Sequence, residues 1–128
     1  MASPRRRALA RRRGVVLRLV RPVGNRAGRL PGMRAATWIE PGRLVAGRHP
    51  CAWSTADAPA EVHGLIAQGV TLFLDLTENG ELAPYAEIVP ASARHVRLAV
   101  RDFTVPTDEQ ITSALDTIDA EIAAGGIV

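Results

Sequence analysis

Residues 71–77 read TLFLDLT, a nearly continuous run of apolar side chains that is rich in strand formers. A short apolar run of this kind is typical of a strand buried on both faces of a parallel sheet. Residues 57–68 precede it and place Val62, Leu65 and Ile66 on one face of a helix. A helix followed by a buried strand indicates an α/β fold.

The expected helix over residues 57–68 carries start and stop signals. Asp57 can cap its N-terminus with the side chain, and Pro59 fits in the first turn. Gly69 is a natural C-terminal stop.

A pair of short strands is expected upstream of this helix. Residues 37–50 read TWIEPGRLVAGRHP, in which residues 38–39 and 43–46 are the strand candidates. Pro41 followed by Gly42 suits a type II turn between them.

Strands and helices continue to alternate downstream. We expect a short helix over residues 82–88 and a second sheet strand over residues 93–100, which read ARHVRLAV. Pro106 makes residues 101–107 an irregular loop. Thr107 and Gln110 then have the spacing of a capping box, which predicts a second long helix. Its apolar side chains at helical spacing are Ile111, Leu115, Ile118 and Ile122.

The last residues read as the start of another strand. Gly125 and Gly126 end the helix, and Ile127 and Val128 are strand formers. An α/β domain rarely ends two residues into a strand that follows a crossover helix. We therefore expect the chain to be truncated at its C-terminus, with the next parallel strand missing.

A basic leader and an acidic remainder divide the chain. Residues 1–34 carry 11 arginines and no acidic residue, whereas residues 35–128 carry five arginines and 13 acidic residues. The net charge of +3 therefore combines a leader of +11 with a domain of −8. We interpret residues 1–34 as an Arg-rich, disordered leader and residues 35–128 as a single domain.

Several roles are open for the leader. Its arginines could bind nucleic acid through phosphate contacts, but it has no aromatic side chain for base stacking. The apolar run over residues 14–20 is interrupted by Arg18 and is too short for a secretory signal. A mitochondrial-type leader would also be Arg-rich and free of acids. Met33 lies where the charge changes sign and could be the true start.

No window of the sequence resembles a membrane span, because none holds 18 consecutive apolar residues. We expect a cytoplasmic protein with no membrane partner.

The cysteine and histidine residues give no metal or thiol site. A single cysteine excludes an intramolecular disulfide. As the nucleophile of a phosphate-binding loop, Cys51 would need Arg six positions later, where Asp57 stands, so we interpret Cys51 as a structural thiol. His49, His63 and His95 lack metal-ligand spacing, and His63 is expected on the exposed part of the first helix.

Two aspartates stand out. Asp75 lies inside the apolar strand, where a buried carboxylate needs backbone N–H groups or an arginine at the strand end as partners. We interpret it as structural. Asp102 follows a strand on the Pro-containing loop, where α/β folds place their chemistry. Taken alone, it is equally an ordinary, solvated loop acid.

Three segments of the acidic domain carry a family pattern. They read WIEPGRLVAGRHP (38–50), VTLFLDLTENGELAPY (70–85) and VRDFTVPTDEQITSALDTIDAEIAAGGIV (100–128). Together they resemble the cysteine-dependent dual-specificity and tyrosine protein phosphatases, most closely the compact bacterial members. The resemblance covers residues 35–128 and implies a three-layer α/β sandwich with a mostly parallel central sheet, incomplete at the C-terminus.

The resemblance also implies a mechanism. In the family the last helix leads into a strand that ends in His-Cys-x5-Arg, and this sequence stops at Val128, before that loop. Intact relatives hydrolyse phosphoesters of proteins or small molecules through a phosphocysteine, with no metal or other cofactor. Asp102 matches by position the general acid that protonates the leaving oxygen and then activates water. We expect the chain as written to be an inactive fragment.

Two other functions stay open. One is a non-catalytic phosphatase-like interaction module whose basic leader binds nucleic acid. The other is an α/β domain of a different family that binds a small ligand at the strand ends.

Overall fold

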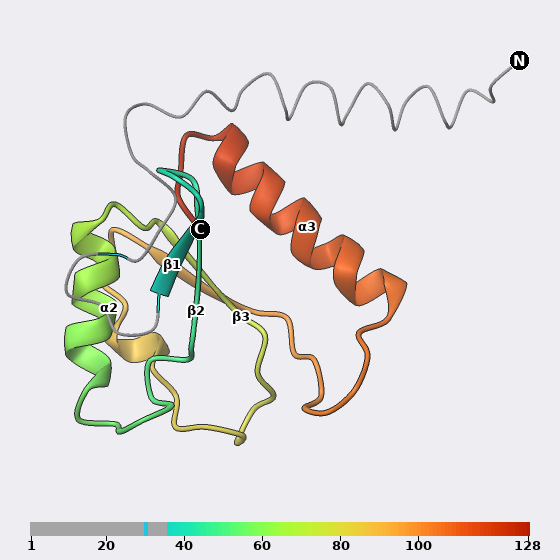
Figure 1. Cartoon of the computed structure of the whole chain (residues 1–128), viewed down its shortest axis with the longest axis horizontal. Coiled ribbons are helices and arrows are strands. Elements are labelled where there is room, and N and C mark those ends of the chain that lie inside the picture. Colours follow the sequence, from blue (N-terminus) through green and yellow to red (C-terminus); the bar gives the residue numbers. More distant parts are fainter. Residues whose placement is uncertain (1–29, 31–35) are drawn as a thin grey trace, which may run out of the picture.

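The computed structural model describes Leu30 and residues 36–128, so the remainder of the Arg-rich leader lies outside the described residues. The described elements alternate between strands and helices, as the sequence predicts (Figure 1). In chain order they are β1 (Ala36–Glu40), β2 (Leu44–Gly47), α2 (Ala58–Ala67), β3 (Leu72–Asp75), the 3-10 helix η1 (Ala86–Ile88), β4 (Arg94–Arg97) and α3 (Asp108–Ala123).

Strands β1 and β2 form the predicted antiparallel pair, in which Trp38 lies opposite Val45. The turn between them closes with the Arg43 N–H donating to the Glu40 carbonyl at 3.0 Å. Gly42 has φ +73°, the left-handed backbone that the third position of a type II turn requires. The predicted turn is therefore confirmed.

Strands β3 and β4 form a parallel pair, with Leu72 opposite Arg94 and Asp75 opposite Arg97. Parallel strands need a crossover connection, and residues 76–93 with η1 supply it. The parallel pair and the flanking helices confirm the predicted α/β fold.

The last two residues connect the two pairs of strands. Val128 donates its N–H to the Arg43 carbonyl at 2.9 Å and accepts at its own carbonyl from the Val45 N–H at 2.7 Å. On the other side, the Leu72 N–H donates to the Ile127 carbonyl at 3.1 Å. This hydrogen bonding places residues 127–128 as a short bridge between β2 and β3.

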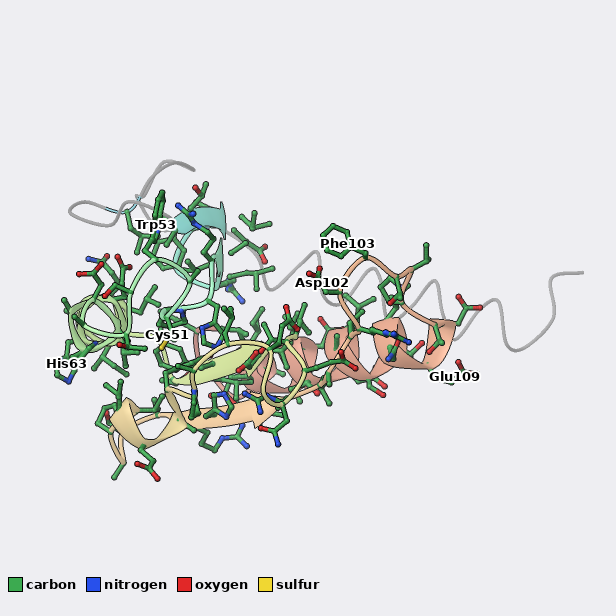
Figure 2. The ribbon with its side chains drawn as sticks, turned by 90° about the horizontal axis from the view of Figure 1, so that it is seen from below. Cys51, Trp53, His63, Asp102, Phe103 and Glu109 are labelled. Atoms are coloured by element: carbon green, nitrogen blue, oxygen red, sulfur yellow. The ribbon has the colours of Figure 1, made fainter. Side chains whose placement is uncertain are left out.

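The two α-helices lie on opposite sides of the strands (Figures 1 and 2). Helix α2 contributes Ala58 and Val62, both fully buried, to the main core. The other buried members of this core are Cys51, Val70, Phe73 and Tyr85. Helix α3 begins with the predicted capping box of Thr107 and Gln110 but has no buried residue. On the apolar face of α3, Ile111 and Leu115 are exposed, whereas Ile118 and Ile122 are half-buried.

Two local predictions are wrong. Asp57 makes no side-chain cap, because its own backbone is helical (φ −83°, ψ −18°), whereas a capping residue has extended geometry. The helix expected over residues 82–88 is reduced to η1. Pro84 and Pro90 leave too little chain between them for an α-helix, since each disfavours helical geometry in the residue before it.

Candidate functional site

The carboxylate of Asp75 joins the ends of β3 and β4. Its side chain is 1% exposed. Oδ1 accepts hydrogen bonds from the Thr77 N–H (2.9 Å) and the Thr77 hydroxyl (2.7 Å). Oδ2 lies 3.1 Å from His95 Nε2 and accepts from Arg97 Nη2, also at 3.1 Å. The predicted partners of Asp75, a backbone N–H and an arginine, are thus confirmed.

These contacts keep Asp75 ionised. Burial alone would raise the pKa of the carboxyl, but the hydrogen bonds from Thr77, His95 and Arg97 outweigh it and lower the pKa to about 2. A buried carboxylate with four polar contacts, one of them from an arginine, is stable in the charged form.

His49 approaches the same carboxylate from the end of β2. Its side chain is 5% exposed, and its Nδ1 accepts from the Cys51 N–H at 3.1 Å, so Nε2 carries the hydrogen of the neutral ring. Nε2 lies 3.7 Å from Asp75 Oδ2, beyond hydrogen-bond reach, and finds no hydrogen-bond partner among the described residues. Burial lowers the pKa of His49 against the attraction of Asp75.

Tyr85 fills the space between the two imidazoles. Its ring meets His49 and His95 edge to face, with centroid distances of 4.8 and 4.9 Å. Burial, reinforced by the charge on Asp75, raises the pKa of the phenol well above its usual range. The sequence did not reveal this cluster of His49, Asp75, Tyr85, His95 and Arg97. The signal that could have indicated part of this cluster is the pairing of the two expected strands, over residues 71–77 and 93–100. Their parallel register places Asp75 opposite Arg97.

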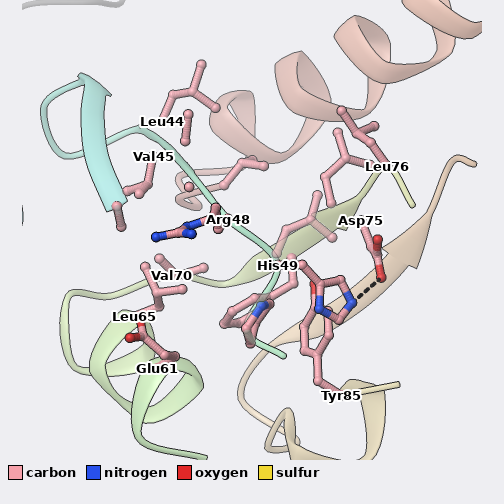
Figure 3. Close-up of a pocket in the computed structure, with 18 of the residues that line it drawn as sticks. Leu44, Val45, Arg48, His49, Glu61, Leu65, Val70, Asp75, Leu76 and Tyr85 are labelled. Atoms are coloured by element: carbon pink, nitrogen blue, oxygen red, sulfur yellow. Dashed lines mark ion pairs between the residues drawn. The ribbon is translucent and has the colours of Figure 1, made fainter. Parts of the chain in front are cut away.

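A cavity of about 410 Å³ lies between β2 and β3 (Figure 3). Val128 lines it where the strands begin, and His49 and Asp75 line it where they end. Leu65 of α2 and Ile118 of α3 also reach it, so both helical layers face the same space. Its lining is mainly apolar, and the cluster around Asp75 supplies its polar end.

Asp102 lies on the exposed loop that follows β4 and is not part of this cluster (Figure 2). Its Oδ1 accepts from the Phe103 N–H at 3.0 Å. Phe103 has φ +57°, unusual for a residue with a bulky side chain, and its ring is fully exposed. Gln110 Nε2 donates to the Ala99 carbonyl at 3.1 Å and ties the loop to the start of α3. The general-acid role of Asp102 stays a prediction.

The interpretation of Cys51 as a structural thiol agrees with its environment. It is a free cysteine in the main core, and burial raises the pKa of its thiol. A raised pKa disfavours the thiolate that a nucleophile requires. Figure 2 shows Cys51 far from Asp102 along the molecule and His63 pointing outward from α2, exposed as predicted.

The described residues contain no group of three or more His, Cys, Asp or Glu side chains arranged to hold a metal ion. Among those same residues, no helix is long and apolar enough to cross a membrane. The proposed nucleic-acid contacts of the leader fall outside the part of the chain that the structure describes, apart from Leu30.

A family model described as "Swiss Army Knife protein, DSP-PTPase phosphatase domain" matches residues 33–126. The matched range includes the Asp75 cluster, the Asp102 loop and all of α3. No curated protein matches the chain.

Proposed function

Because the chain belongs to the family of Swiss Army Knife proteins with a DSP-PTPase phosphatase domain, we propose that it forms part of an enzyme that hydrolyses phosphate monoesters through a phosphocysteine. Membership of this family implies phosphorylated substrates in general. In the proposal the described residues supply the framework of the site and the general-acid loop. The nucleophilic cysteine and the phosphate-binding arginine come from a strand and loop that enter the cavity between β2 and β3.

The observation that carries this proposal is the hydrogen bonding of residues 127–128. They pair with β2 on one side and β3 on the other, and the 410 Å³ cavity continues along both strands from Val128. A strand running on in this direction would be parallel to both neighbours. Its end would lie at the edge of the sheet where β2, β3 and β4 also end, the usual place for a site in an α/β fold.

The proposed reaction has two steps. A thiolate attacks phosphorus and forms the S–P bond while the bond to the leaving oxygen breaks, and the Asp102 carboxyl gives its proton to that oxygen. Water then attacks the phosphocysteine, the S–P bond breaks, and the Asp102 carboxylate takes the proton from water. Cys51 is a poor alternative nucleophile, because it is buried and Asp57 occupies the position where an arginine would be needed.

A phosphatase assay tests which part of the protein supplies the nucleophile. The 128-residue chain should not hydrolyse para-nitrophenyl phosphate. A reading frame continued past the Val128 codon should encode His-Cys with Arg six positions after Cys. The longer protein that it encodes should hydrolyse this substrate. Turnover by the 128-residue chain that Cys51→Ser abolishes would contradict the proposal.

The role of Asp102 has its own test in the longer protein. Asp102→Asn should lower kcat by about 100-fold or more, since general-acid catalysis contributes roughly 10²–10⁴. The loss should be larger with phenyl phosphate than with para-nitrophenyl phosphate, because the nitrophenolate leaves without needing a proton. Asp108→Asn, an exposed acid in the first turn of α3, is the matched control and should leave kcat unchanged.

A further inference from the structure

Arg48 and Trp53 form a stacked pair directly after β2. The guanidinium carbon of Arg48 lies 3.7 Å from the centroid of the Trp53 ring. Trp53 is 66% exposed, so its ring is not held by the core. Stacking on an aromatic face fixes the plane of a guanidinium while its N–H donors, which lie in that plane, stay available to a ligand.

The guanidinium of Arg48 has no carboxylate within ion-pair distance in the part of the chain that the structure describes. Two other arginines of that part, Arg94 and Arg97, are paired with Glu121 and Asp75. Arg48 is exposed and also lines the cavity between β2 and β3 (Figure 3). It therefore offers an oriented set of donors at the mouth of this cavity.

The pair lies at the same edge of the sheet as Asp102. Arg48 follows β2 and Asp102 follows β4, and both strands run parallel to the bridge formed by residues 127–128. Loops that follow parallel strands gather at one edge. Figure 2 looks onto this edge and shows Trp53 near β1 and Asp102 near α3.

We infer that Arg48, held by Trp53, is a specificity-determining residue that binds an oxyanion of the substrate, a phosphate or a carboxylate, beside the phosphate that is hydrolysed. The position of this subsite beside a reacting phosphate rests on the proposed function. The binding of an oxyanion by Arg48 does not depend on that function. Arginine suits this task because its planar fork matches the oxygens of phosphate and carboxylate groups in a bidentate contact.

Binding can be measured on the 128-residue chain by NMR. Inorganic phosphate and succinate are titrated separately, and the indole N–H of Trp53 and the Nε–H of Arg48 are followed. Saturable shifts at both groups are expected with at least one of the two probes, and the stronger one identifies the chemistry of the anion. Arg48→Gln should weaken binding about tenfold or more, since hydrogen bonds to charged groups contribute roughly 1.5–3 kcal/mol. Arg94→Gln, which removes an exposed arginine elsewhere, should leave binding unchanged.

The stacking has a separate readout. Trp53→Phe keeps an aromatic face and should retain most of the affinity, whereas Trp53→Ala should lose it although the charge of Arg48 remains. Equal shifts in the Arg48→Gln variant, or no saturable shift with either probe, would overturn the inference.

A second measurement separates this inference from the proposed function. In the longer protein, Arg48→Gln should raise KM for a phosphopeptide with a neighbouring aspartate and leave KM for the same peptide with alanine unchanged. Equal effects on both peptides would also refute the subsite. If anion binding is seen but no hydrolysis occurs, the proposed function fails while the oxyanion site stands.

Discussion

His49 Nε2 lies 3.7 Å from Oδ2 of Asp75, in a buried space where that oxygen already binds His95 and Arg97. The end of β2 thus lies against the ends of β3 and β4 at one carboxylate. The geometry makes Asp75 the polar centre of the sheet edge that also carries the Asp102 loop.

Removing the charge of Asp75 should destabilise the fold strongly. Asp75→Asn leaves Arg97 without its anion, and breaking a buried ion pair costs roughly 3–5 kcal/mol. We expect a loss of about 3 kcal/mol in the free energy of unfolding, measured by urea denaturation. Asp102→Asn, on an exposed loop, should change it by less than about 0.5 kcal/mol. Equal losses for the two variants would contradict the structural role of Asp75.

Stability should fall with acid in two stages. Burial lowers the pKa of His49 below its ordinary value of 6.5, so the unfolded chain binds a proton more readily than the folded chain. The contribution of neutral His49 to the free energy of unfolding is complete above pH 6.5. It is lost as the pH falls towards the pKa of His49 in the folded protein. Asp75 has its pKa lowered from 3.8 to about 2, so its contribution is present above pH 3.8 and is lost between pH 3.8 and 2.

Urea unfolding at a series of pH values measures both stages. His49→Phe should remove the loss of stability that begins below pH 6.5 and leave the loss between pH 3.8 and 2. His63→Gln is the matched control, because His63 is exposed on α2 and should leave both stages in place. A decline below pH 6.5 that persists in His49→Phe would assign it to another group.

Local sequence signals predicted the elements of this fold, and long-range contacts determined the site. Pro41 and Gly42 predicted the turn, and Thr107 with Gln110 predicted the start of α3. Both features depend on residues that are close in sequence. The contact of His49 with Asp75 depends on which strands are neighbours in the sheet, and no spacing in the sequence encodes this. Asp57 was mispredicted because residue type alone does not fix the backbone that a cap requires.

The thiol of Cys51 should react slowly in the folded protein. It is 8% exposed and burial raises its pKa, so both access and the thiolate fraction are low. Reaction with a chromogenic disulfide at pH 8 should be at least tenfold slower without urea than in denaturing urea. Equal rates in both conditions would show that the packing around Cys51 opens readily.

Truncating an apolar residue of the core should lower the free energy of unfolding much more than truncating an exposed one. Val62 of α2 is fully buried, and truncation to alanine removes packed methyl groups from the main core, which should cost about 2 kcal/mol. Leu115 of α3 is 54% exposed, so Leu115→Ala should change the free energy of unfolding by less than about 0.5 kcal/mol in the 128-residue chain. Urea denaturation of both variants measures the difference. In the longer protein the cost of Leu115→Ala should rise above 1 kcal/mol if the added chain packs on α3, and an unchanged cost would show that this face stays open to solvent.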